Sequence, residues 1–255
     1  MRPLAIDLFC GLGGWTEGLL AEGYRVVGFD VERHHYGEAK YPAQLVLQDV
    51  LTIHGKQFKD AALIVASPPC QEFSYMAMPW SKAKQKAADY RNGTRDVKQL
   101  TALFNACFRI QREAIEAAGH HIPLVVENVR GAQPWVGRSR WNFGSFHLWG
   151  DVPALMPIAR HLKGAGYNMN KGTAKKWNTH ESDFSAIAAG VLVGIKQGGI
   201  SGPRANGKGD AWFQDGAAKH GSKSNARKAA SAMIAKIPTV LSAWIAKTYH
   251  PERVA

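Results

Sequence analysis

Apolar and polar positions alternate along the first 150 residues as strands and helices alternate in an α/β domain. Short apolar runs bounded by glycine, proline or aspartate predict strands, and longer stretches with apolar positions three or four residues apart predict helices. The expected strands are 4–9, 24–29, 43–48, 61–66, 123–126 and 145–148, and the expected helices are 15–22 and 99–118. This order predicts an α/β fold with a doubly wound, mostly parallel sheet.

The pattern changes between residues 160 and 225, where glycines and basic side chains crowd together and only residues 185–195 look regular. Such a segment predicts a small irregular region or a set of substrate-contacting loops, with a flexible linker as the alternative. Helical patterns return at 226–235 and 239–247. We therefore expect three parts, which are a catalytic and cofactor-binding domain (1–150), a small irregular basic region (151–225) and C-terminal helices that return to the first domain (226–255).

The net charge of +12 is unevenly distributed. Residues 1–150 carry 17 lysines and arginines against 14 acidic side chains, whereas residues 151–255 carry 15 against 6. A basic part beside a nearly neutral one favours a polyanionic substrate, although a generic solvated surface is the alternative. A second basic stretch with aromatic side chains covers residues 75–86 and predicts either a lid or a surface helix.

Cysteine content and hydropathy narrow the class of protein further. No apolar run approaches the ~18 residues that span a membrane, and the chain enters its first strand without a signal-peptide pattern. The three cysteines, Cys10, Cys70 and Cys107, form neither a disulfide framework nor a zinc pattern. We therefore expect a cytoplasmic protein without a membrane or metal partner, in which a free thiol can serve as a nucleophile.

A glycine-rich turn follows the first expected strand. Its residues are Asp7, Leu8, Phe9, Cys10, Gly11, Leu12, Gly13 and Gly14. Glycines allow a tight strand-to-helix turn and a close approach of a ligand to the backbone. The spacing differs from the G-x-G-x-x-G of dinucleotide folds, but it still predicts a cofactor site.

Acidic side chains follow the second and third strands. Asp30 ends the second strand, where an acidic residue commonly binds ribose hydroxyls, and Glu32 is an alternative for that role. Asp49 ends the third strand, where it is suited either to accept a hydrogen bond from an adenine amino group or to cap a turn. Together with the glycine turn, these positions favour a nucleotide-like cofactor.

A thiol and a carboxyl group follow two later strands. Cys70 comes after Pro68 and Pro69, which end the apolar run 61–66 and stiffen the chain. Glu127 ends the fifth strand, and a buried glutamate near a ligand base tends to have a raised pKa and to donate a proton. Because the carboxyl ends of parallel strands share one edge, we expect both groups in one crevice.

Two arginines follow this glutamate. Arg138 and Arg140 project to one side if the backbone is extended. They are suited to fix an anionic intermediate or the catalytic backbone, with an ordinary surface pair as the alternative.

These motifs, taken together, resemble those of the DNA (cytosine-5) methyltransferases. Residues 7–14 look like the cofactor-binding first motif of that family, and residues 67–71 like its Pro-Cys motif. Residues 127–129 look like its Glu-Asn-Val motif, and residues 138–140 like its Arg-x-Arg motif. The motifs follow the family's order and cover roughly residues 1–150.

The resemblance implies a covalent mechanism on a cytosine that is flipped out of double-stranded DNA. Cys70 would attack C6 of the base as a thiolate, and Glu127 would hold N3 and the exocyclic amine. Arg140, with Arg138, would support the base and the loop that carries the thiol. The segment 71–98 would close over the flipped base, and C5 would then take the methyl group.

The resemblance also implies S-adenosylmethionine as the methyl donor, S-adenosylhomocysteine as its product, and no metal. Phe9 would pack on the adenine, Asp30 would meet the ribose and Asp49 the adenine amine. The full implied set of cofactor-binding residues is Phe9, Cys10, Gly11, Leu12, Gly13, Gly14, Asp30, Val31, Asp49, Val50 and Pro69. The fold implied is the Rossmann-like methyltransferase type with a target-recognition region over 151–225, acting as a monomer in a bacterial or phage-infected cell.

The chain departs from the family pattern near its C-terminus. The family's closing motif contains Gly-Asn, whereas residues 233–238 read Met-Ile-Ala-Lys-Ile-Pro. The target-recognition region is short, which favours a short or relaxed target site and is similar to phage- or prophage-borne members. Two alternatives remain, an RNA cytosine methyltransferase on the same fold and a non-catalytic DNA-binding protein on a decayed scaffold. Retention of Cys70, Glu127 and Arg140 argues against the decayed scaffold.

Overall fold

A computed structural model describes residues 2–73, 80–156 and 235–254, together with short pieces between residues 167 and 232. Those pieces are 167–168, 173–174, 224–225, 228–229 and 232. The expected helix at 226–235 lies mostly outside the described residues, and the regular segment expected at 185–195 lies entirely outside them.

A seven-stranded sheet forms the centre of the fold, in the order β5-β2-β1-β6-β7-β9-β8. The strands are β1 (Leu4–Leu8), β2 (Arg25–Asp30), β5 (Gln44–Leu47), β6 (Ala61–Ala66), β7 (Leu124–Asn128), β8 (Trp141–Phe143) and β9 (Phe146–Gly150). The first five strands in this spatial order are parallel, whereas β9 runs antiparallel to both of its neighbours. The predicted doubly wound, mostly parallel sheet is thereby confirmed.

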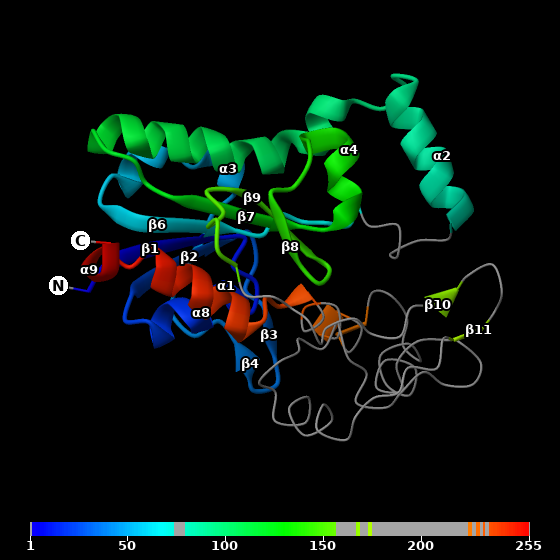
Figure 1. Ribbon diagram of the computed structural model, residues 1–255. Coiled ribbons are helices and arrows are strands. Elements are labelled where there is room, and N and C mark those ends of the chain that lie inside the picture. Colours follow the sequence, from blue (N-terminus) through cyan, green and yellow to red (C-terminus); the bar gives the residue numbers. More distant parts are fainter. Residues whose placement is uncertain are drawn as a thin grey trace.

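Helices cover both faces of this sheet (Figure 1). On one face lies α3 (Val97–Ala118), and on the other lie α1 (Gly14–Ala21) and α8 (Thr239–Thr248). Each face has its own apolar core, with Ile110 of α3 fully buried in one, and Leu19 of α1 and Leu241 of α8 fully buried in the other. Burial of each such side chain contributes ~2 kcal/mol, so these layers hold the strand ends in place.

Glycines in α1 let α8 and the segment before it approach closely. A Cβ at Gly18 would lie 2.3 Å from Oγ of Ser242, and a Cβ at Gly14 would lie 2.4 Å from the backbone nitrogen of Ile237. Both contacts are shorter than real Cβ atoms tolerate, so only glycine permits this packing. The C-terminal part thus closes directly over the helix that follows the glycine-rich turn.

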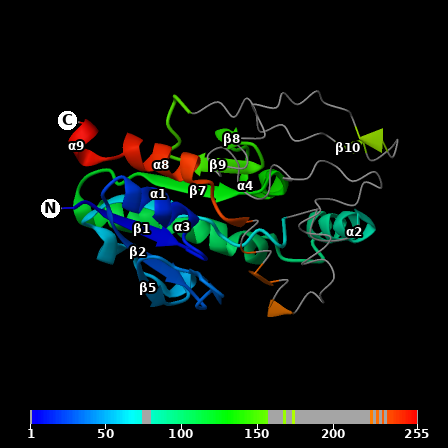
Figure 2. The ribbon, with the colours of Figure 1, turned by 90° about the horizontal axis from the view of Figure 1, so that it is seen from below.

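The remaining elements are short, except for one helix. They are β3 (His35–Tyr36), β4 (Ala39–Lys40), η1 (Val50–Thr52), η2 (Gly55–Phe58), α2 (Trp80–Arg91), η4 (Arg130–Ala132), α4 (Gln133–Val136), β10 (Tyr167–Asn168), β11 (Thr173–Ala174) and α9 (Pro251–Val254). Figures 1 and 2 both show α2 far from α9, with α4 between them. None of the described helices is both long and apolar enough to cross a membrane.

Several elements begin and end close to the predicted residues, where caps and apolar runs mark their boundaries. The apolar run 61–66 is strand β6, and α3 begins where Asp96 accepts a hydrogen bond from the backbone of Lys98 at 2.7 Å. That helix ends at Gly119, whose φ of +73° suits a glycine C-cap. The fifth strand is longer than expected and runs to Asn128, which places Glu127 inside the strand.

Helix α2 and strand β8 are two of the elements that the sequence pattern did not clearly predict. Residues 80–91 form helix α2, so the helix alternative holds for that part of the basic stretch after Cys70, while residues 74–79 lie outside the described residues. Strand β8 pairs only with β9, at the edge of the sheet. Because an edge strand of three residues has little apolar periodicity, its sequence carries a weak signal.

Candidate active site

The turn after β1 has a strained backbone. Phe9 adopts a φ of +58°, and it is the only non-glycine residue with positive φ among the described residues. Gly11 (φ +51°) and Gly13 (φ +79°) follow in the same left-handed range, where glycine has no steric cost. Left-handed geometry at a bulky side chain costs on the order of 1–3 kcal/mol and persists where the surroundings impose it, which is typical of ligand sites.

Asp30, at the end of β2, fastens this turn. Its Oδ2 accepts a hydrogen bond from the backbone of Gly11 at 2.9 Å, and its Oδ1 accepts one from Val31 at 2.8 Å. Burial alone would raise the pKa of Asp30, but hydrogen bonds from His34 and Gly11 outweigh burial and hold that pKa below its ordinary value. The group is therefore a carboxylate, shaped to accept hydrogen bonds at the rim of the turn.

A fully buried polar network lies beneath the turn. Thr16 of α1 donates to Oδ2 of Asp7 at 2.6 Å and shares a 2.7 Å hydrogen bond with the hydroxyl of Tyr41. Burial raises the pKa of Asp7 to about 7, and its Oδ1 has no hydrogen-bond partner among the described residues. Tyr41 also packs against the backbone of Gly28, where a Cβ would lie 2.3 Å from its ring. Neither Tyr41 nor Thr16 was singled out from the sequence.

Exposed apolar side chains border the same strand ends. Val31 is 68% exposed and Leu51 is 49% exposed, next to the carboxylates of Asp30 and Asp49 respectively. A Cβ placed on Gly11 would meet no atom within 4 Å, so open space lies beside the turn. Open space, apolar surface and acceptor oxygens together fit an adenosine-containing cofactor.

Two of the predicted cofactor-binding residues, Asp49 and Val50, have structural roles in the fold. Asp49 caps η1, because its Oδ1 accepts a hydrogen bond from the backbone of Leu51 at 2.9 Å, as the capping alternative expected. Val50 is 1% exposed and packs in the core, whereas Leu51 presents the exposed apolar surface beside it. Of the other predicted residues, Cys10, Leu12, Gly13 and Gly14 are buried within the turn, Phe9 is half-buried and Pro69 is exposed.

The thiol loop, residues 67–73, follows β6 at the neighbouring strand end. Trp15 of α1 donates a hydrogen bond to Oγ of Ser67 at 3.0 Å. The side chain of Asn128 donates to the carbonyl oxygen of Pro68 at 2.9 Å. These two contacts hold the first two residues of the loop, and Cys70 further along it is partly exposed. The two anchors connect residues far apart in sequence, so no local pattern predicted them.

Cys70 is the only one of the three cysteines that is not buried. Burial raises the pKa of the Cys10 thiol well above its ordinary value, and the nearby Asp7 and Asp30 charges raise it further. Burial also raises the pKa of Cys107 to about 12. The two buried thiols are therefore held protonated and inert, which leaves Cys70 as the accessible sulfur.

Glu127 lies on β7, the parallel neighbour of β6. Since Ala66 pairs with Val126, Glu127 is level with Ser67, the first residue of the thiol loop. The side chain of Glu127 is buried, with 7% of the residue exposed. The structure therefore brings the predicted carboxyl group and the thiol loop to one edge of the sheet.

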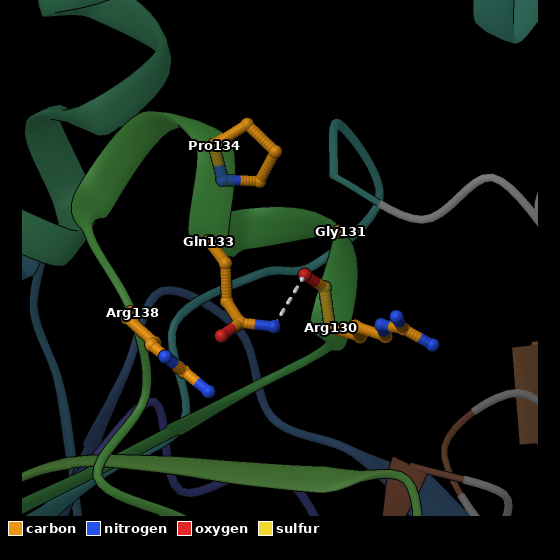
Figure 3. Close-up of a pocket in the computed structure, with 5 residues that line it drawn as sticks. All are labelled: Arg130, Gly131, Gln133, Pro134 and Arg138. Carbon is orange, nitrogen blue, oxygen red and sulfur yellow. Dashed lines mark hydrogen bonds between the residues drawn. The ribbon is translucent and has the colours of Figure 1, made fainter.

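The two predicted arginines have different surroundings. Arg138 lines a pocket with Arg130, just after β7 (Figure 3). Arg140 donates its backbone N–H to Leu148 at 2.8 Å, and its charge acts on Tyr249, whose hydroxyl bonds to the carbonyl oxygen of Asp151. Gly137, directly before this pair, has a positive φ of +89°. That Arg138 and Arg140 project to one side stays a prediction.

Residues 236 and 237, within the stretch where we expected the family's Gly-Asn motif, lie against α1. Lys236 forms an ion pair with Glu17 at 2.5 Å, and the next residue, Ile237, closes over Gly14. This stretch therefore contacts the helix that follows the glycine-rich turn through one ion pair and one tight backbone contact. The described residues contain no group of three His, Cys, Asp or Glu side chains arranged to hold a metal ion.

The sheet order, the reversed β9 and the glycine turn after β1 define a fold of the S-adenosylmethionine-dependent methyltransferase type. Within that class, residues 4–133 match the family model of the C-5 cytosine-specific DNA methylases. This match covers just over half of the 255 residues. The chain therefore belongs to the C-5 cytosine-specific DNA methylase family, and the family prediction from its motifs is confirmed.

Several solved structures are similar to parts of this chain. A putative DNA modification methyltransferase encoded within an E. coli prophage is 20% identical over 51% of this chain and 33% of its own, with a TM-score of 0.33. The S. pombe Dnmt2 methyltransferase is 17% identical over 54% and 37%, with a TM-score of 0.34. The Entamoeba histolytica methyltransferase EhMeth is 18% identical over 54% and 41%, with a TM-score of 0.33. The chain thus spans only about a third to two fifths of these structures, and comparison with curated proteins gave no match.

Proposed function

We propose that this protein is a DNA cytosine C5 methyltransferase that uses S-adenosylmethionine and forms a covalent bond between Cys70 and the target base. The observation that carries the proposal is the placement of an accessible thiol and a buried carboxyl group at neighbouring strand ends. Cys70 follows β6, and Glu127 lies near the end of β7. Membership of the methylase family supports the assignment of the base as cytosine.

The proposed reaction begins with a cytosine flipped out of the duplex into the crevice. The Cys70 thiolate donates an electron pair to C6, and Glu127 stabilises the displaced ring electrons through hydrogen bonds to N3 and the exocyclic amine. The activated C5 would form a bond to the methyl carbon as the bond from that carbon to the sulfonium sulfur of the donor breaks, leaving S-adenosylhomocysteine. Loss of the C5 proton to a base then breaks the bond between sulfur and C6, which restores the aromatic ring and releases the Cys70 thiolate.

S-adenosylmethionine supplies the electrophilic methyl group when it is bound. The left-handed turn at Gly11 and Gly13 would let this donor approach the backbone, and Asp30 would accept hydrogen bonds from its ribose. Phe9 and the exposed Val31 would pack on the adenine, and Asp49 would accept a hydrogen bond from the adenine amine. The carboxylate state of Asp30 suits this role, because an ionised acceptor forms the stronger hydrogen bonds.

The proposed substrate is double-stranded DNA, supported by the family and by the charge of the chain. The net charge of +12 resides mostly in residues 151–255, most of which lie outside the described residues. Lysine and arginine contacts to phosphates release counterions, so the affinity for DNA should fall steeply with salt.

The decisive experiment is methyl transfer with a labelled donor. The purified protein would be incubated with S-adenosylmethionine carrying a labelled methyl group and with unmethylated genomic DNA or bulk tRNA. Label recovered as 5-methylcytosine in DNA, and lost in Cys70→Ala, would support the proposal. Label in tRNA would reassign the substrate to RNA, and no label in either with DNA binding intact would indicate a non-catalytic DNA-binding protein.

A further inference from the structure

A basic pocket lies directly after β7, beside the proposed catalytic edge. It has a volume of about 580 Å³ and is lined by Arg130, Gly131, Gln133, Pro134 and Arg138. Figure 3 shows Gln133 between the two arginines, which come from different segments of the chain. Both arginine residues are exposed, so a ligand can reach their guanidinium groups from solvent.

The side-chain amide of Gln133 joins the backbones on the two sides of this pocket. Its Nε2 donates to the carbonyl oxygen of Arg130 at 3.5 Å, the dashed line in Figure 3. Its Oε1 accepts hydrogen bonds from the backbone and the hydroxyl of Ser139, at 3.2 and 3.4 Å. Since Ser139 follows Arg138 directly, one amide sets the separation of the two arginines.

The pocket is also tied to the thiol loop. The hydroxyl of Ser139 shares a 2.9 Å hydrogen bond with Nδ1 of His147, and His147 pairs with Asn128 across β7 and β9. Asn128 in turn binds the carbonyl oxygen of Pro68, two residues before Cys70. The pocket and the thiol loop are therefore held by one connected frame.

Neither arginine has a counterion within this frame. Among the described residues, no carboxylate lies within 4.0 Å of the guanidinium nitrogens of Arg130 or Arg138, whereas Arg109 pairs with Glu113 at 2.9 Å. Guanidinium groups bind phosphate oxygens in a bidentate geometry, and two unpaired ones in a single pocket attract an anion strongly. An exposed pocket with two such groups matches one phosphodiester better than it matches a neutral ligand.

We propose that Arg130 and Arg138 form a binding site for a backbone phosphodiester of the DNA strand that carries the target cytosine, with Gln133 as the positioning residue. The inference rests on the proposed function, because a base turned into the crevice keeps its phosphates outside it. The hydrogen bonds from Ser139 to His147 and from Asn128 to Pro68 connect this site to the loop that carries Cys70. The site positions the strand and carries no sequence information.

The test is the salt dependence of DNA binding, measured by fluorescence anisotropy with labelled fragments of unmethylated genomic DNA. Arg130→Ala and Arg138→Ala should each lower the magnitude of the slope of log Kd against log salt by about 0.9, the value for one phosphate contact. The double variant should lower it by about 1.8. Arg25→Ala is the matched control, because Arg25 is an exposed arginine at the opposite, N-terminal end of β2.

Gln133→Ala tests the positioning role through non-additivity. If Gln133 sets the separation of the arginines, adding Arg138→Ala to Gln133→Ala should weaken binding less than Arg138→Ala alone does. Additive losses would remove Gln133 from the proposal. Unfolding midpoints equal to that of the wild-type protein would show that each variant is folded.

Two results would overturn the phosphate site. One is a slope for the arginine variants equal to that of Arg25→Ala, and the other is a change in slope for bulk tRNA but not for DNA. Because the binding assay needs no methyl transfer, its failure is distinct from failure of the proposed activity. Methylated DNA with unchanged salt slopes would reject only the pocket, and changed slopes without methylation would reject only the enzyme.

Discussion

The turn after β1 and the loop after β6 lie at neighbouring strand ends, yet they are built in opposite ways. The turn, residues 9–14, rests on the buried network of Asp7, Thr16 and Tyr41. The first two residues of the thiol loop, residues 67–73, each accept one side-chain hydrogen bond, and Glu72 near its end contacts Tyr90 and Lys86 of α2. Between these anchors, Pro69 and Gln71 are exposed. A site that binds a cofactor gains from a rigid floor, whereas a nucleophile must remain accessible.

The same difference separates Cys10 from Cys70. Both cysteines follow a strand at the same edge of the sheet, but Cys10 is 5% exposed with a raised pKa, whereas Cys70 is partly exposed. Surroundings, and not residue type, therefore decide which thiol can react. Each prediction below tests one side of this comparison.

The largest effect is expected from the two cysteines themselves. Cys70→Ala should abolish methyl transfer, because no other described thiol is accessible, while Cys10→Ala should retain turnover within about tenfold. Transfer of labelled methyl groups measures both variants, and circular dichroism verifies their folds. Normal turnover by Cys70→Ala would show that Cys70 is not the nucleophile and that accessibility does not distinguish the two thiols.

Glu127→Gln should lower kcat by about 100-fold or more, since an amide cannot supply the proton transfer assigned to a buried carboxyl group. The Kd for DNA should change less than about threefold, because the residue acts on the flipped base and not on the strand. Single-turnover rates and anisotropy separate the two quantities. Equal losses in rate and affinity would point to a structural role for Glu127.

The anchors of the two regions should have separable effects. Asn128→Ala removes the hydrogen bond to Pro68 and should lower kcat by about tenfold while leaving the Kd for S-adenosylmethionine unchanged. Tyr41→Phe removes the hydroxyl below the glycine turn and should instead raise that Kd, with kcat nearly unchanged. Calorimetric titration and steady-state kinetics distinguish them, and the reverse pattern would contradict the division of roles.

Asp7→Asn should flatten the dependence of stability on pH. The folded pKa of Asp7 is about 7 against an ordinary 3.8, so between these values the folded state keeps a proton that the unfolded state has released. The stability that protonated Asp7 contributes is therefore fully present below pH ~4. It is lost as the pH rises to about 7, by up to about 1.4 kcal/mol per pH unit. Urea unfolding across this range measures the slope. Asp60→Asn, at an exposed aspartate, should leave the wild-type slope, and an equal slope in Asp7→Asn would refute the prediction.

The smallest effect is expected at the closing segment. Lys236→Met removes the half-exposed ion pair with Glu17, and such pairs contribute at most about 1 kcal/mol. The Kd for S-adenosylmethionine should therefore rise no more than about fivefold, and Lys247→Met, on the exposed side of α8, should not change it. Calorimetric titration measures both values. A larger rise for Lys236→Met would show that the lysine contacts the cofactor directly.

The sequence predicts the sheet and the strand-end motifs well, because both signals are local. The run 61–66 needs only its own apolar residues to be recognised, and the glycine turn needs only its spacing. The hydrogen bonds from Asn128 to Pro68 and between Thr16 and Tyr41 are different, because they join residues far apart in the sequence that belong to no common local pattern. Their formation depends on strand order and side-chain packing, which a linear pattern does not contain.

Helix α1 and the segment that covers it lie far apart in the chain, and α1 is synthesised well before its partner. Its glycine face is filled by Ile237 and Ser242, and Tyr24 just after it donates a hydrogen bond to the carbonyl oxygen of Ala246. More than 200 residues must be synthesised before these contacts can form. Loop closure over such a separation is slow, so we expect the face of α1 that packs against α8 to stay uncovered during translation. Folding of the catalytic sheet is thereby coupled to completion of the region that lies between them in the chain.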